Sequence, residues 1–251
     1  MTPDGNNRDI DLPWQKINHF KIISNSNILF GKPWLEIDIG YQNNDRNEYS
    51  QPHAHGYAPT PDGTLAHGLY LQTGSLNARY FMHLSERHTR TIGLQSQFQK
   101  NERGGFEPLL PDFNTYSIGS FIYEELSWAN RFTINGGLRF DYANNIIDEF
   151  LQPIYNRDLE ITQYFRRNGD INNKFYNFSG AAGFSYYPTQ TVNYKLNLGT
   201  SFKVPTPTEL AISEKLLEAI QRKMWRNPEP ETVNRLNDLF IKADYTIEER
   251  S

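Results

Sequence analysis

Residues 132–142 read FTINGGLRFDY, and this stretch decides the fold class. Its even-numbered positions carry Phe, Ile, Gly, Leu, Phe and Tyr, whereas its odd-numbered positions carry Thr, Asn, Gly, Arg and Asp. Successive side chains of a β-strand point to opposite faces of the sheet. An alternation with a period of two therefore predicts a strand that has one apolar face and one polar face.

The same alternation recurs along most of the chain. It predicts seven further strands, at 16–30, 35–41, 69–82, 92–98, 113–127, 176–186 and 192–204. Short turns and long polar loops alternate between them. The short turns are expected at 31–33, 84–88, 129–130 and 188–190, and the long loops at 50–68, 103–112 and 148–173. The fold class is therefore all-β and antiparallel, with hairpins that have one short end and one elaborate end.

This asymmetry is typical of outer-membrane β-barrels, which have short periplasmic turns and longer extracellular loops. Aromatic residues also gather beside the short turns, as expected for the aromatic girdle of such a barrel. The residues concerned are Phe30, Trp34, Trp128, Phe132, Tyr186, Tyr187 and Tyr194.

The direction of the two faces is left open by the alternation. In a wide membrane barrel the apolar face points to lipid and the polar face lines the lumen, whereas a soluble barrel or sandwich buries its apolar face. A soluble β-sandwich or barrel that binds a ligand through its long loops is therefore the alternative. It requires Ile134, Leu138 and Phe140 to pack in a dry core.

The composition excludes several other classes of protein. The 251 residues include 25 Lys and Arg against 29 Asp and Glu, a net charge of −4, which argues against a nucleic-acid-binding protein. An aromatic content of 14% argues against disorder. The absence of cysteine excludes disulfides, thiolate zinc sites and a cysteine nucleophile. We find no catalytic or phosphate-binding motif, and we expect neither an enzyme nor a cofactor.

Four stretches resemble a known family. Residues 137–142 (GLRFDY) resemble the G-L-R-[FY]-D strand of TonB-dependent outer-membrane receptors, and residues 179–186 resemble the strand that follows it. Residues 199–210 are similar to the family's S-F-R-A-P-x-x-x-E-L segment, with Lys203 where Arg is usual. Residues 52–59 (PHAHGYAP) resemble receptors of the Bacteroidetes type.

The resemblance implies a location in the cell outer membrane and a barrel of about 22 strands around an N-terminal plug. It also implies energised uptake of a nutrient such as a metal chelate, a corrinoid or a glycan. The implied partners are that small molecule, outer-membrane lipid and a TonB-type coupling protein. Eight strands would form only part of such a barrel, so we expect a fragment of the barrel region.

The chain divides into three segments on this interpretation. Residues 1–13 are a polar linker that lacks the pattern of a signal peptide, and residues 14–210 are the partial receptor barrel. In residues 211–251 the apolar positions change to helical spacing, which predicts a short helical C-terminal tail that is not barrel-like.

Candidate binding residues lie in the first long loop. His53, His55 and Tyr57 are expected to contact the ligand, because loops carry binding function more often than the scaffold does. The spacing of His53 and His55 places both rings on one face of an extended chain, and His67 could add a third ligand for a metal. Two imidazoles alone seldom make a metal site, since structural zinc takes four ligands. No metal site is therefore expected, and no catalytic residue is assigned.

Overall fold

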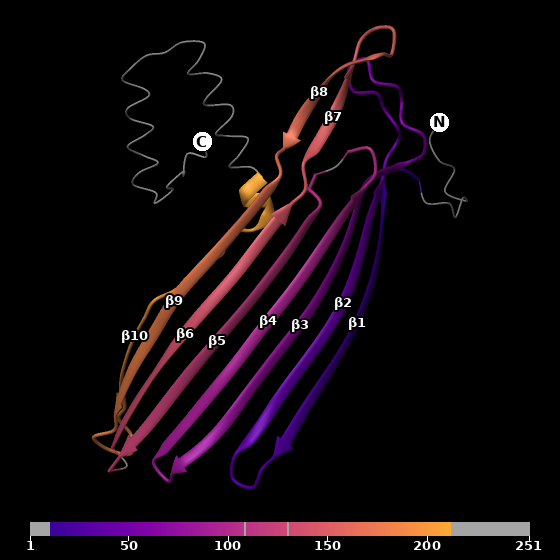
Figure 1. Cartoon of the computed structure of the whole chain (residues 1–251). Coiled ribbons are helices and arrows are strands. Elements are labelled where there is room, and N and C mark those ends of the chain that lie inside the picture. Colours follow the sequence, from indigo (N-terminus) through magenta and orange to yellow (C-terminus); the bar gives the residue numbers. More distant parts are fainter. Residues whose placement is uncertain (1–10, 108, 130, 212–251) are drawn as a thin grey trace, which may run out of the picture.

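The computed structural model describes residues 11–107, 109–129 and 131–211. Eight strands form one sheet in the order β1-β2-β3-β4-β5-β6-β9-β10, and every neighbouring pair is antiparallel (Figure 1). Their bounds are β1 Trp14–Leu29, β2 Trp34–Tyr49, β3 Leu65–Ser85, β4 His88–Gly104, β5 Phe113–Trp128, β6 Phe132–Ile147, β9 Ile171–Tyr186 and β10 Tyr194–Gly199. All eight strands predicted from the alternation are confirmed.

The two ends of the sheet differ as expected. The turns that follow β1, β3, β5 and β9 are short and lie together at one end, at the bottom of Figure 1. The connections that follow β2, β4 and β6 are longer and lie together at the other end. We call these the short-turn end and the long-loop end.

The longest predicted loop, at 148–173, is in fact mostly a β-hairpin. Strands β7 (Phe150–Tyr155) and β8 (Ile161–Asn168) form a separate two-stranded sheet that extends beyond the main one (Figure 1). The Oδ1 atom of Asn156 accepts hydrogen bonds from the backbone N–H groups of Asp158 and Glu160, both at 2.9 Å. This side chain closes the turn locally, so that β7 and β8 on either side of it can pair.

The apolar face of the main sheet is open. Ile134, Leu138 and Phe140 are 54%, 51% and 47% exposed, and no second sheet packs on them within the described residues. The buried apolar side chains of the described residues are few: Ala66, Ala143, Ile147, Leu210 and Ala211. The dry core that the soluble alternative requires is therefore absent from residues 11–107, 109–129 and 131–211, and the main sheet there is a single layer, like part of a barrel wall.

The opposite face carries paired charges. Arg139 donates to both carboxylate oxygens of Asp141, and its Nη1 donates to Gln95 Oε1 at 2.6 Å. On the neighbouring strand Gly119 leaves the room that this pair occupies, since a Cβ there would lie 2.3 Å from both Arg139 Nη2 and Asp141 Oδ1. The GLRFDY stretch thus places its charges on one face and its large apolar side chains on the other.

Two rows of aromatic side chains lie at the two ends of the apolar face. On β6, Phe132 stacks on Tyr186 of β9 with ring centroids 4.7 Å apart, and Tyr142 lies 5.1 Å from Tyr176. Ten residue steps separate the two rows on β6. At a rise of about 3.3 Å per residue and a strand tilt of about 40°, this separation is about 25 Å along the barrel axis. Outer-membrane barrels carry an apolar band of about that height between two aromatic girdles.

One expected girdle residue lies on the other face. Trp34 points to the polar side of β2, where its ring stacks on Phe81 at 4.6 Å and its Nε1 donates to Glu36 at 3.1 Å. The reason is register, because Trp34 is one residue out of phase with the apolar positions Leu35 and Ile37.

Two of the predicted segments lie largely outside the described residues: residues 1–10 of the linker and residues 212–251 of the tail. The division of the chain into three segments therefore stays a prediction. Residues 207–211 form a single helical turn, and the carbonyl of Pro205 just before it accepts a hydrogen bond from Asn145. In the described part of the chain, no helix has the length and apolar character that spanning a membrane takes.

Candidate functional site

The candidate site lies at the long-loop end, where three segments meet. The loop between β2 and β3 is closed by a backbone hydrogen bond from Ser50 N to Thr64 O at 2.9 Å. The segment after β4 is fixed to the start of β3 by two backbone hydrogen bonds, from Phe106 N to Leu65 O and from Glu107 N to Ala66 O at 2.8 Å. Glu107 is therefore held beside the start of β3.

Gly105 makes this arrangement possible. Its φ is +84°, a conformation that residues with a Cβ rarely adopt. A Cβ at this position would also lie 2.3 Å from Ala66 O. Only glycine can therefore turn the chain at this point and keep Glu107 beside β3.

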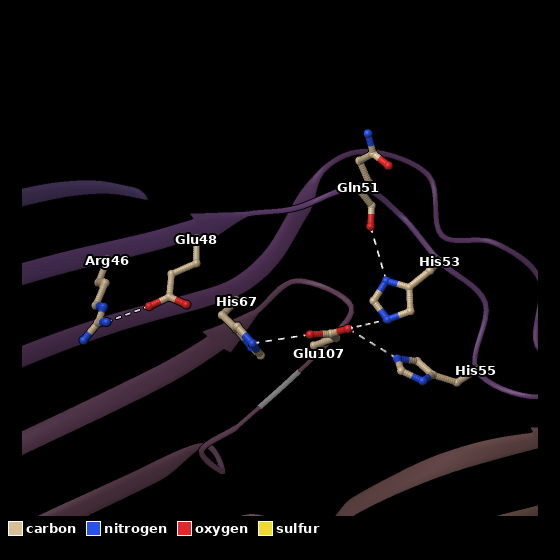
Figure 2. Close-up of polar contacts among 7 residues, drawn as sticks. All are labelled: Arg46, Glu48, Gln51, His53, His55, His67 and Glu107. Atoms are coloured by element: carbon tan, nitrogen blue, oxygen red, sulfur yellow. Dashed lines mark hydrogen bonds and ion pairs between the residues drawn. The ribbon is translucent and has the colours of Figure 1, made fainter. Parts of the chain in front are cut away.

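Three histidines surround the Glu107 carboxylate (Figure 2). His53 Nε2 lies 2.8 Å and His55 Nε2 lies 3.4 Å from Glu107 Oε1, whereas His67 Nε2 lies 3.5 Å from the other oxygen, Oε2. His53 and His55 come from the first long loop and His67 comes from β3. We call these four residues the His/Glu cluster.

The solvent exposure of the side chains decreases from the outer to the inner residues of the cluster. The side chains of His53 and His55 are 52% and 55% exposed, whereas those of Glu107 and His67 are 28% and 16% exposed. An open pocket of about 510 Å³ lies beside the inner pair and is also lined by Trp14 and Glu48. A solute at the long-loop end can therefore reach the cluster directly.

The hydrogen bond of His53 fixes the position of its ring proton. His53 Nδ1 lies 3.2 Å from the carbonyl oxygen of Gln51. A carbonyl oxygen can only accept, so Nδ1 carries a proton and donates it. The second nitrogen, Nε2, is the atom that faces Glu107 (Figure 2).

Tyr57 lies apart from the two histidines with which it was predicted. Its hydroxyl accepts a hydrogen bond from Arg157 Nε at 3.2 Å, and the guanidinium carbon lies 5.8 Å from the ring centroid. Arg157 belongs to the turn between β7 and β8, so Tyr57 connects the first long loop to that hairpin. The structure thus brings His53 and His55 to one point and Tyr57 to another.

Sequence reasoning missed Glu107 and Arg157. Glu107 is more than 50 residues from His53, and no local motif marks either residue. A weak signal for Glu107 was the Gly104-Gly105 pair just before it, which indicates an unusual turn in a loop.

Comparisons with known proteins agree on one architecture. Residues 4–237 match the family described as TonB dependent receptor-like, beta-barrel. No curated protein sequence matches the chain.

Two solved structures illustrate the likeness. The FrpB iron transporter from Neisseria meningitidis (F3-3 variant) is similar with a TM-score of 0.57 at 12% identity, over 79% of this chain and 30% of that one. The open form of Fiu, a ferric-catecholate import receptor from E. coli K12, has a TM-score of 0.53 at 13% identity, over 77% of this chain and 36% of that one. The chain thus spans about a third of the length of these structures, and identities this low show a shared fold alone.

Proposed function

Because the chain belongs to the family of TonB-dependent receptor-like β-barrels, we propose that it forms about a third of the wall of an outer-membrane receptor that imports a scarce nutrient. The family is one of receptors and transporters, and we assign no catalytic step. The proposal concerns the assembled receptor, whose remaining strands would continue from the two open edges of the sheet, β1 and β10.

The observation that carries the proposal is the single-layer sheet with two unlike faces. Its apolar face is exposed and lies between aromatic rows about 25 Å apart, the height of the apolar band of an outer-membrane barrel. Its other face carries the Arg139–Asp141 pair and the ion pair of Arg79 with Glu36, at 2.9 Å. Such a face suits an aqueous or plugged lumen and would be costly in lipid.

The substrate class follows from the family and the loops. We propose a metal chelate, a corrinoid or a glycan, and the names of the two similar structures favour an iron chelate. The nutrient would first meet His53, His55 and Tyr57, since they are exposed at the long-loop end, which is extracellular on this proposal. Affiliation with the Bacteroidetes type rests on residues 52–59 and remains a proposal.

The proposed partners are those of the assembled receptor. A TonB-type coupling protein would supply the energy from the inner membrane, and outer-membrane lipid would cover the apolar face. In the same way, residues 14–210 are proposed to be the barrel segment, with residues 1–13 as a linker and 211–251 as a tail.

Uptake by cells tests the proposal. A strain that lacks the gene should lose energy-dependent accumulation of one labelled compound from a panel of ferric chelates, corrinoids and oligosaccharides, and the gene in trans should restore it. A protonophore should abolish the same uptake in the wild type. Unchanged uptake of every compound, together with recovery of the protein in the soluble fraction, would contradict the proposal.

A further inference from the structure

We propose that His53, His55 and Glu107 bind a divalent transition-metal ion. This inference goes beyond nutrient import, because it concerns the binding of the ion itself and holds whether or not the receptor transports it. One ligand atom from each residue already lies within 4.8 Å of the other two.

The donor atoms are close to the spacing that a metal requires. A tetrahedral Zn²⁺ ion with bonds of about 2.0–2.1 Å to nitrogen and oxygen holds its ligand atoms about 3.3 Å apart. The distances of His53 Nε2 and His55 Nε2 from Glu107 Oε1 are 2.8 Å and 3.4 Å. Both histidine side chains are about half exposed, so small rotations can complete the geometry without moving the sheet.

The hydrogen bond of His53 matches that of a metal-binding histidine. His53 Nδ1 donates to Gln51 O, and the other ring nitrogen, Nε2, lies 2.8 Å from Glu107 Oε1, where an ion would bind. A metal-binding histidine almost always donates its other N–H to a carbonyl, a carboxylate or water, as His53 does here.

The inner residues position the carboxylate. His67 Nε2 lies 3.5 Å from Glu107 Oε2, which leaves Oε1 for the ion, and the backbone hydrogen bond to Ala66 fixes the Glu107 main chain. Three protein ligands leave one tetrahedral position free, and the exposure of His53 and His55 opens that position to solvent.

The donor set selects the class of ion. Two imidazoles and one carboxylate suit Zn²⁺ and its transition-metal neighbours, whereas Mg²⁺ and Ca²⁺ take mainly oxygen ligands. The chain has no cysteine, so no thiolate favours Cu⁺ here. The bound ion would join the first long loop to the segment after β4 and hold that loop over the end of the sheet.

Calorimetry with ZnCl₂ tests the inference. The receptor is purified in detergent at the full length that its gene encodes and is stripped of metal with a chelator. The wild type should bind Zn²⁺ saturably, and H53Q, H55Q and E107Q should each weaken that binding. Loss of a residue that merely orients a ligand costs about 10–100-fold in affinity, so loss of a ligand should cost at least tenfold. Co²⁺ in place of Zn²⁺ should give visible absorption bands in the wild type that each variant loses.

A second histidine–glutamate pair supplies the matched control. His88 lies 2.5 Å from Glu124 at the short-turn end of the sheet and belongs to no cluster of three metal-binding groups in the described part of the chain. H88Q should therefore leave the Zn²⁺ affinity unchanged. Heat-dependent migration on a denaturing gel shows that each variant retains the folded barrel.

Three outcomes would overturn the inference: no saturable Zn²⁺ binding by the wild type, equal affinity in the wild type and E107Q, or an equal loss in H88Q. The first two would leave the cluster as a set of ion pairs. None of the three bears on nutrient uptake, so failure of this inference and failure of the proposed function can be told apart.

Discussion

Arginine at position 138 gives a quantitative test of which face meets lipid. The midpoint between the two aromatic rows on β6 corresponds to the bilayer midplane, and Leu138 is one residue from it. At a rise of about 3.3 Å per residue and a tilt of about 40°, Leu138 is therefore about 2.5 Å from the midplane. Arginine on the lipid face at the midplane destabilises an outer-membrane barrel by about 2–4 kcal/mol. L138R should therefore lower the folded-to-unfolded ratio by a factor of roughly 30 to 1,000.

The matched control is A181R on the polar face. Ala181 of β9 pairs with Gly137 of β6, next to Leu138, so it lies at almost the same depth. Reversible unfolding by guanidinium in phospholipid vesicles, followed by tryptophan fluorescence, gives the free energy of unfolding of both variants. A loss in A181R equal to or greater than that in L138R would refute the assignment of the two faces.

Two further substitutions test local features. G119V places a side chain where Arg139 and Asp141 now pair, since even a Cβ would lie 2.3 Å from Arg139 Nη2 and from Asp141 Oδ1. The substitution should lower the free energy of unfolding by about 1–3 kcal/mol. An unchanged unfolding midpoint would contradict the packing described for Gly119. Lys203 Nζ donates to the exposed carboxylate of Glu209, which lies beyond the strands. Together with the backbone N–H of Thr206, which donates to the same carboxylate, it lowers the pKa of that carboxyl to about 2. The contribution of this ion pair is then present above about pH 4.5 and is lost as the pH falls toward 2. K203M should raise the Glu209 pKa toward 4.5, as measured by carboxyl ¹³C NMR, and an unchanged value would contradict the assigned cause.

The strands were predictable because their signal is local. A residue's place in the alternation fixes its face, so residues 132–142 alone predicted both faces of β6. The short turns and long loops also alternate in the sequence itself. The same rule accounts for the error at Trp34, which was assigned by its nearness to a turn although its phase places it on the polar face.

The rest depends on contacts between distant residues. Hairpin β7–β8 forms around the Asn156 side chain, within a stretch whose polarity indicated a loop. The two histidines were candidates from the sequence, and both rings face Glu107 in the structure. Glu107 reaches them only through the backbone hydrogen bonds between its segment and the start of β3. Local sequence patterns carry no information on contacts between residues of different loops. The His/Glu cluster could therefore be recognised only in the structure.

Site-directed spin labelling of β6 tests the central claim most directly. The chain contains no cysteine, so a cysteine introduced at each position from 132 to 142 is unique within it. In reconstituted receptor, labels at even positions should collide more with oxygen, which concentrates in lipid, and labels at odd positions more with a water-soluble nickel chelate. The account predicts this alternation with a period of two, and the opposite phase or uniform accessibility would contradict it.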